Sequence, residues 1–154
     1  MNCSQLYLGS TERLDEVASE EFSVELVRSG TKEGQLLRRL LGLPYVYYLA
    51  PHTGCGCGWE VLEVGSDWDE KNRGSCFRLG AFLQSAEDAC GSLAIYSACI
   101  ASIGREPDEE LSLPSVAFLQ RINELRVRYS SEQVRVFRLA PNNSSKPTPL
   151  RGAA

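Results

Sequence analysis

Apolar and polar residues alternate along three stretches of the chain, which is the pattern of a β-strand with one buried face. The alternation runs loosely through residues 3–9 and more strictly through residues 22–27 and 134–139. Residues 45–50 are instead apolar at every position and rich in aromatic and branched side chains. Such a strand usually lies inside a sheet with both faces covered. A fifth strand is expected over residues 59–64, as a hairpin partner of residues 45–50.

Other stretches have the spacing of an amphipathic helix. In residues 32–43 leucines recur at four positions of one helix face, and Gly42 is a natural C-cap. Ser85 is expected to be the N-cap of a second helix that continues to residue 103. A third helix is expected over residues 115–129, directly after Pro114.

The remaining segments are polar. Residues 11–21 are expected to form a loop or one helical turn, and residues 65–75 and 105–113 are expected to be charged loops. Residues 76–83 show no clear period, and residues 141–154 are expected to form a flexible C-terminal tail.

The order of these elements indicates the fold class. Strands and helices are interspersed without a regular β-α-β alternation, which favours an α+β protein. We expect a single globular domain over residues 1–140, with a mixed or antiparallel sheet of about five strands and two or three helices. A chain of 154 residues is long enough for one domain with a full hydrophobic core.

Composition narrows the possible partners. The net charge is −4 and no run of lysine or arginine stands out, so binding to nucleic acid or an anionic membrane is not expected. The N-terminal residues lack the basic start and apolar block of a secretory signal. No apolar run approaches the roughly 20 residues that a membrane helix needs. These features predict a cytoplasmic protein with no membrane contact.

One segment carries most of the candidate chemistry. Residues 51–59 read Pro-His-Thr-Gly-Cys-Gly-Cys-Gly-Trp, and His52 is the single histidine of the chain. The glycines let the backbone adopt positive φ angles and approach an ion closely. In an extended segment Cys55 and Cys57 would point to the same side. Because Zn²⁺ prefers thiolate and imidazole ligands, we expect a zinc site at His52, Cys55 and Cys57.

A closed structural zinc site needs a fourth ligand. Cys3 is the candidate, because it opens the first expected strand and an adjacent strand would bring it beside the loop. An open fourth position would instead suit a water or a substrate and would make the site potentially catalytic. We expect a structural or regulatory metal site, with an unknown small molecule or protein as the partner.

Two other classes of function fit the same residues. Cys55 and Cys57 would also serve a thiol-redox or thiol-transfer enzyme, although a disulfide between them would close a tight and strained ring. Alternatively, the loop is only a tight turn in a metal-free interaction domain, since cysteine is often a small buried hydrophobe. The pattern therefore leaves open whether the protein is an enzyme.

Two motifs in about the first 60 residues resemble a small uncharacterised bacterial protein family. They are Cys3-Ser-Gln-Leu-Tyr-Leu-Gly-Ser10, and Pro44-Tyr-Val-Tyr-Tyr-Leu followed by His52-Thr-Gly-Cys-Gly-Cys-Gly-Trp59. Members of that family begin with a cysteine and a Leu-Tyr-Leu-Ala-Ser strand and carry a His-x-Gly-Cys-Gly-Cys-Gly-Phe loop. Trp59 replaces the phenylalanine here. The resemblance implies a bacterial, cytosolic origin and a pairing of Cys3 with the loop, but no activity.

Overall fold

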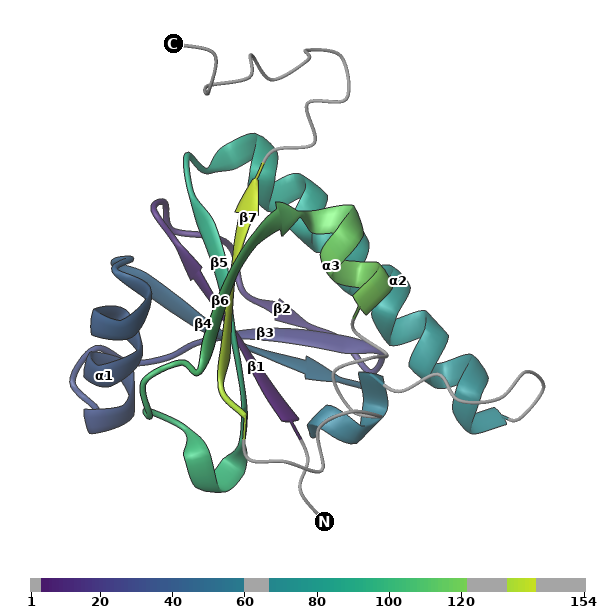
Figure 1. Ribbon diagram of the computed structural model, residues 1–154. Coiled ribbons are helices and arrows are strands. Elements are labelled where there is room, and N and C mark those ends of the chain that lie inside the picture. Colours follow the sequence, from purple (N-terminus) through teal and green to yellow (C-terminus); the bar gives the residue numbers. More distant parts are fainter. Residues whose placement is uncertain (1–3, 60–66, 122–132, 141–154) are drawn as a thin grey trace, which may run out of the picture.

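The computed structural model describes residues 4–59, 67–121 and 133–140, which form a seven-stranded sheet with helices on both faces (Figure 1). The strands are β1 (Ser4–Ser10), β2 (Val17–Ala18), β3 (Phe22–Leu26), β4 (Tyr45–Pro51), β5 (Leu93–Cys99), β6 (Glu109–Pro114) and β7 (Arg135–Ala140). The helices are α1 (Lys32–Leu41), α2 (Asp67–Ala89) and α3 (Ser115–Arg121), with short 3₁₀ turns η1 (Gly56–Trp59) and η2 (Ile100–Ser102).

The sheet is mixed and has the strand order β2-β3-β4-β1-β5-β7-β6. Every neighbouring pair is antiparallel except β6 and β7, which are parallel. Strand β1 is the central strand, with β4 on one side and β5 on the other. The expected α+β class is confirmed, but the sheet has seven strands in the described part of the chain rather than about five.

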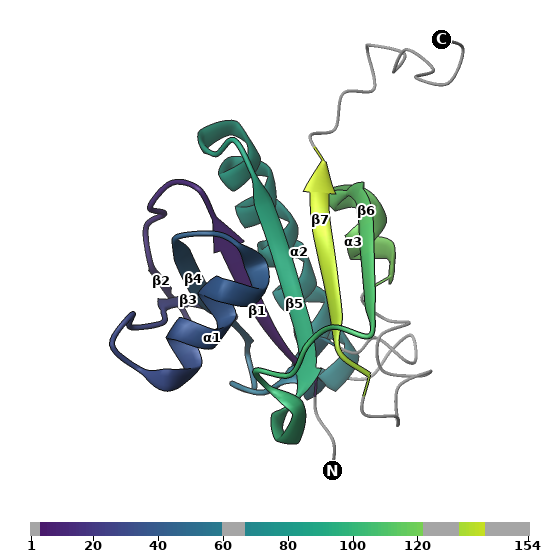
Figure 2. The same ribbon diagram turned by 60° about the vertical axis from the view of Figure 1, so that its left-hand side comes forward.

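The helices divide between the two faces of the sheet. Figure 2 shows α1 on one face and α2 on the other, with α3 beside α2. The core accordingly separates into two apolar clusters. Along β1, Leu6 and Leu8 belong to the cluster under α2 and α3, whereas Tyr7 belongs to the cluster under α1. This division follows from the alternation of side chains along a strand.

Several sequence predictions are confirmed. β4 is an interior strand with both faces largely buried, as its continuous apolar run indicates. α1 begins after Thr31, whose side chain accepts a hydrogen bond from the Gly34 amide, and its C-cap is Gly42 in the left-handed conformation with φ 67°. α3 begins at Ser115, directly after Pro114. The rest of the helix expected up to residue 129 lies outside the described residues, as does the expected tail over residues 141–154.

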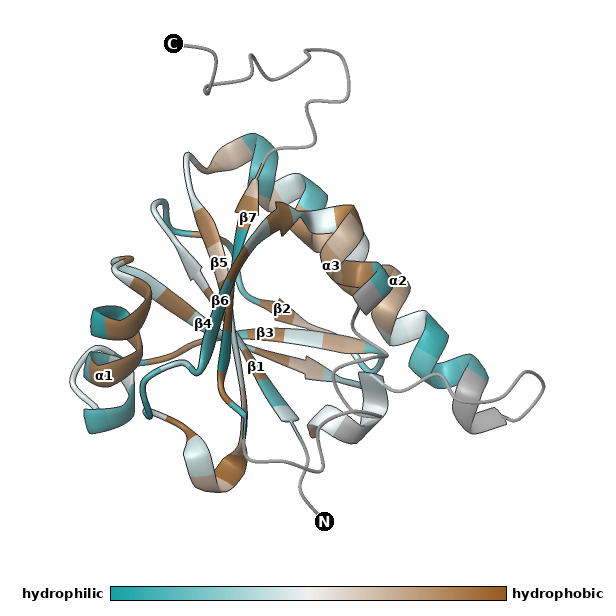
Figure 3. Cartoon of the chain, in the orientation of Figure 1, coloured by the Kyte–Doolittle hydropathy of each residue, from teal (hydrophilic) through white to brown (hydrophobic). Residues whose placement is uncertain are grey.

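The helix expected from Ser85 to residue 103 is wrong. Ser85 lies near the end of α2, and Leu93–Cys99 is a strand that is buried at every position. A short apolar run that is covered on both faces has the same composition in a strand and in a buried helix, so periodicity alone does not separate them. The loop expected over residues 65–75 is also wrong from Asp67 onward, where α2 begins. Figure 3 shows that the lower end of α2, next to its grey tip, is hydrophilic, which explains the misassignment.

The charged loop expected over residues 105–113 is wrong from Glu109 onward, where β6 begins. β6 is an edge strand, and edge strands commonly carry charged side chains. Salt bridges join it to β7, from Arg135 to Glu109 at 3.2 Å and from Arg138 to Glu110 at 2.6 Å. Of the strand expected over residues 59–64, Trp59 lies in η1 and the other residues lie outside the described part. Among the described helices, none is long and apolar enough to cross a membrane.

Candidate functional site

The glycine-cysteine loop (residues 52–59) leaves the end of β4 and folds back on itself. Gly54 has a positive φ of 72°, and its amide donates to the Pro51 carbonyl at 2.9 Å. The Thr53 hydroxyl donates to the Cys55 carbonyl at 2.8 Å. The chain then enters η1, where the Gly58 amide donates to the Cys55 carbonyl at 3.1 Å. The loop is therefore a compact turn and not an extended segment. The prediction that Cys55 and Cys57 point to the same side assumed an extended backbone, and this assumption is wrong.

Gly56 packs directly against the start of the central strand. A Cβ atom built on Gly56 would lie 1.5 Å from the Ser4 carbonyl oxygen and 2.6 Å from its carbon. No other residue type fits this position without moving the backbone. Gly56 separates Cys55 from Cys57, and Ser4 directly follows Cys3 in the chain. The contact therefore places the residue after Cys3 against the residue between the two loop cysteines.

His52 is directed to α2. Its Nε2 atom lies 2.5 Å from Oδ1 of Asn72, and its backbone amide donates to the Ser75 hydroxyl at 3.0 Å. The Ser75 hydroxyl in turn donates to the Glu21 carbonyl at 2.7 Å. Asn72 and Ser75 are fully buried, so these hydrogen bonds satisfy polar groups that water does not reach.

The buried face of α2 changes character along its length. Leu79, Leu83 and Ala86 occupy this face where it covers the sheet. One and two turns earlier the same face presents Ser75 and Asn72 to the loop. Sequence reasoning missed both residues because it placed them in a solvated loop. The available signal was the helical spacing of positions 72, 75, 79, 83 and 86, which becomes visible once polar residues are allowed on a buried face.

The predicted metal ligands are described to different extents. The side chains of His52 and Cys55 are both described by the structure. The Sγ atom of Cys55 lies 3.8 Å from Oγ1 of Thr53. Cys57 is described only through its backbone in η1, and Cys3 lies outside the described residues. Among the side chains that are described, no three of the types His, Cys, Asp and Glu form a group that could hold a metal ion.

Cys76 contacts the glycine-cysteine loop as a buried thiol. Cys76, on α2, donates to the Trp59 carbonyl at 3.4 Å, and burial raises the pKa of its thiol to about 11. A thiol with a raised pKa is a poor nucleophile at neutral pH. Cys99 is buried on β5 and Cys90 follows the last residue of α2.

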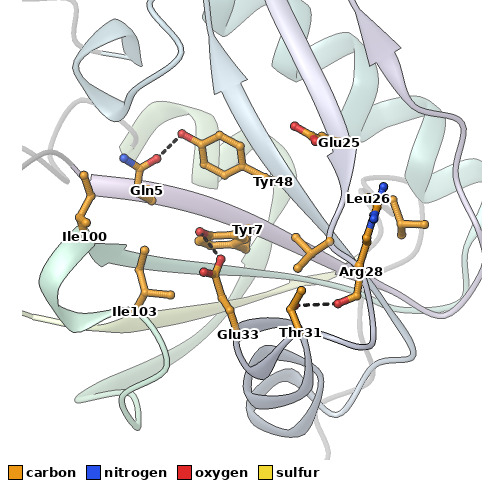
Figure 4. A pocket seen from close by; sticks show the side chains of 11 residues that line it. Gln5, Tyr7, Glu25, Leu26, Arg28, Thr31, Glu33, Tyr48, Ile100 and Ile103 are labelled. Carbon is orange, nitrogen blue, oxygen red and sulfur yellow. Dashed lines mark hydrogen bonds between the residues drawn. The ribbon is translucent and has the colours of Figure 1, made fainter.

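A tyrosine pocket adjoins the loop on the face of the sheet that carries α1 (Figure 4). It has a volume of about 530 Å³. Its wall includes Gln5, Tyr7, Glu25, Glu33, Tyr48 and Ile103. The Tyr7 hydroxyl donates to the Glu33 carboxylate at 2.7 Å. Burial first, and then the bond with Glu33, raise the pKa of Tyr7 well above its ordinary value, so this hydroxyl keeps its proton.

Tyr48 connects the pocket with the loop. Its hydroxyl lies within hydrogen-bonding reach of the Gln5 side-chain amide and 2.9 Å from the Gly54 carbonyl. The Gln5 Oε1 atom and the Gly54 carbonyl both accept from this hydroxyl, so its one proton is shared between two acceptors. One side chain thus has its ring in the pocket and its hydroxyl on the loop.

Comparisons with known proteins return no match to this chain among family models, curated proteins or solved structures. The resemblance to a bacterial family carrying the His-x-Gly-Cys-Gly-Cys-Gly-Phe loop stays a prediction. The glycine-cysteine loop and the tyrosine pocket are the two features of the described residues that bear on function.

Proposed function

We propose that the protein binds a structural or regulatory zinc ion at the glycine-cysteine loop, with Cys55, Cys57, Cys3 and His52 as its ligands. The observation that supports this most strongly is the contact between Gly56 and the Ser4 carbonyl. Successive Cα atoms are about 3.8 Å apart, so Cys3 begins one residue from the point where the loop meets β1. Three thiols and one imidazole form a ligand set typical of closed zinc sites.

The contact between His52 and Asn72 is compatible with a role as metal ligand. Metal-bound histidines usually donate their second ring N–H to an acceptor, which fixes the ring orientation. With Nε2 directed to Asn72 at 2.5 Å, coordination would use Nδ1 and would leave this bond intact. Asn72 would then orient the ligand from a fully buried position on α2.

The position of the site suggests what the metal would do. The loop follows β4, and Ser4 begins β1, which pairs with β4 in the centre of the sheet. A metal bound to both segments would join the ends of two central strands and hold the loop against α2. An ion that binds only the folded chain stabilises it by an amount that rises with the logarithm of its concentration relative to its dissociation constant.

Metal analysis of protein purified without a histidine tag tests the proposal. We expect one zinc ion per chain in the wild type and in Cys90→Ala, a control thiol beyond the end of α2. We expect the ion to be lost from the double variant Cys55→Ala, Cys57→Ala. A chelator should lower the Tm of the wild type and leave the Tm of the double variant unchanged. Absence of stoichiometric metal together with no chelator effect would contradict the proposal.

The same preparations separate the two alternative functions. Fast alkylation of Cys55 and Cys57 in metal-free protein, with a depressed thiol pKa, would indicate thiol-redox or thiol-transfer chemistry instead. A double variant with unchanged stability and unchanged binding partners would indicate a metal-free interaction domain.

A further inference from the structure

The tyrosine pocket exists because the two faces of the sheet are covered unequally. α1 has 10 residues and spans about 15 Å, whereas α2 on the opposite face has 23 residues. α1 covers the part of the sheet that contains Val46 and Ala94. Past the N-terminal end of α1, the same face of the sheet stays open around Gln5 and Tyr48.

The floor of the pocket is aromatic. The rings of Tyr7 and Tyr48 have centroids 5.3 Å apart and are tilted by 48°. Tyr7 is buried, with 5% of its surface exposed, and Tyr48 is only partly buried, so the ring of Tyr48 is the more accessible surface. The face of a tyrosine ring carries partial negative charge and attracts cations within about 6 Å of its centre.

Carboxylates complete the negative character of this wall. The Glu33 carboxylate is held beside the tyrosines by the hydroxyl of Tyr7 at 2.7 Å. Glu25, on β3, lies at the rim near Tyr48 (Figure 4). The guanidinium of Arg28 lies at the other side of the pocket, beside Leu26 and away from Glu33. The lining of the pocket therefore holds two acids, Glu25 and Glu33, against one basic side chain, Arg28.

We propose that the tyrosine pocket binds a small organic cation, with an alkylated ammonium group placed over the ring of Tyr48 and beside the Glu33 carboxylate. The apolar part of the ligand would lie against Ile103, which lines the same pocket. Ring and carboxylate would act on the same cation, because Tyr7 contacts both of them: its ring packs beside Tyr48 and its hydroxyl donates to Glu33. The proposal does not rest on the proposed zinc ion.

Titration of the full chain with choline, its neutral carbon isostere dimethylbutanol and glycine betaine tests the proposal. Backbone and tyrosine NMR shifts report where each probe binds. We expect choline to shift the signals of Tyr48, Tyr7 and Glu33. The neutral isostere should bind roughly tenfold more weakly, because it lacks the ring and carboxylate attraction. Equal binding of choline and dimethylbutanol, a preference for betaine, or no shift with choline would overturn the proposal.

Matched variants assign the interaction to the two groups. Tyr48→Phe keeps the aromatic face and should retain choline binding, whereas Tyr48→Leu removes the ring and should lose it. Glu33→Gln changes an exposed residue of α1, so folding is not at risk, and should weaken choline roughly tenfold without weakening dimethylbutanol. Unchanged choline affinity in Glu33→Gln and in Tyr48→Leu would overturn the assignment.

Discussion

The imidazole of His52 and the side-chain amide of Asn72 are joined across the junction between the glycine-cysteine loop and α2, with 2.5 Å between Nε2 and Oδ1. Asn72 is fully buried, so its amide depends on this partner and its other protein contacts rather than on water. The position of the loop therefore depends on a polar contact in a place where other parts of α2 use leucine.

Asn72→Ala should lower the free energy of unfolding by about 1–3 kcal/mol, because it leaves a polar ring without its acceptor in a half-buried site. His52→Ala and the double variant complete a thermodynamic cycle. Denaturant unfolding of the four proteins should give a coupling energy above about 0.5 kcal/mol. Additive losses would show that the two side chains act separately.

Gly56→Ala should destabilise the protein by at least about 1–3 kcal/mol, since the new methyl group overlaps the Ser4 carbonyl. Gly74→Ala is the matched control. Gly74 lies inside α2 with open space where a Cβ atom would lie, so alanine should stabilise the helix by up to about 1 kcal/mol. Thermal or denaturant unfolding measures both changes, and a neutral Gly56→Ala variant would argue against the close contact.

Cys76 should make the stability depend on pH above its ordinary pKa. The unfolded thiol loses its proton near pH 9.0, whereas burial keeps the folded thiol protonated up to about pH 11. Between these values the unfolded chain binds fewer protons, so the free energy of unfolding falls as pH rises, by on the order of 2 kcal/mol. Below pH 9.0 the thiol is protonated in both the folded and the unfolded chain, so it makes no pH-dependent change to the stability there.

Denaturant unfolding between pH 8 and 10 checks this prediction on the wild type and Cys76→Ala. The variant should lose the decline that begins near pH 9.0. Above pH 10.0 both proteins should lose stability, because burial also raises the pKa of Tyr7 and Tyr96. Identical slopes in the two proteins below pH 10.0 would exclude the effect of the thiol.

Replacing Arg138 should lower the free energy of unfolding more than replacing its salt-bridge partner Glu110. Its guanidinium contacts the Glu110 carboxylate at 2.6 Å and also donates to the Leu41 carbonyl at the end of α1. Glu110→Gln removes a half-exposed ion pair and should cost less than about 1 kcal/mol. Arg138→Met should cost about 1–3 kcal/mol, because it also leaves the α1 carbonyl without its donor. Denaturant unfolding of the two variants measures the difference.

Tyr48→Phe should loosen the glycine-cysteine loop while leaving the sheet in place. The substitution removes the hydroxyl that donates to the Gly54 carbonyl at 2.9 Å. Amide hydrogen exchange should become faster at Gly54, Gly56 and Gly58 and stay unchanged in β4, which pairs on both sides. Faster exchange throughout β4 would instead indicate a general loss of stability.

The sequence predicts the fold where the pattern of burial has one explanation. The alternating run of β3, the leucine face of α1 and the Gly42 cap all lead to the observed elements. β5 could not be assigned in this way. Both of its faces are buried, so its apolar residues show no periodicity that would distinguish a strand from a helix. β6 was missed for the opposite reason, since an edge strand tolerates charges that resemble those of a loop.

The candidate site was located only in part. The glycine-cysteine loop stands out in the sequence through its composition, and Gly56 shows why glycine is needed there. Asn72 and Ser75 could not be assigned, because polar residues buried on a helix face look like solvent-exposed ones until their partners are known. The tyrosine pocket brings together β1, β4 and the start of α1, which only the strand order places side by side.

The central place of β1 also sets the order in which the protein can assemble during synthesis. Leu6 pairs with Leu49 on one side and with Ser97 on the other. The second partner leaves the ribosome roughly 90 residues after the first strand, so the nascent chain holds β1 without its β5 neighbour until those residues have been made. Contacts this distant along the chain slow folding. A chain truncated after α2 should therefore expose β1 and aggregate.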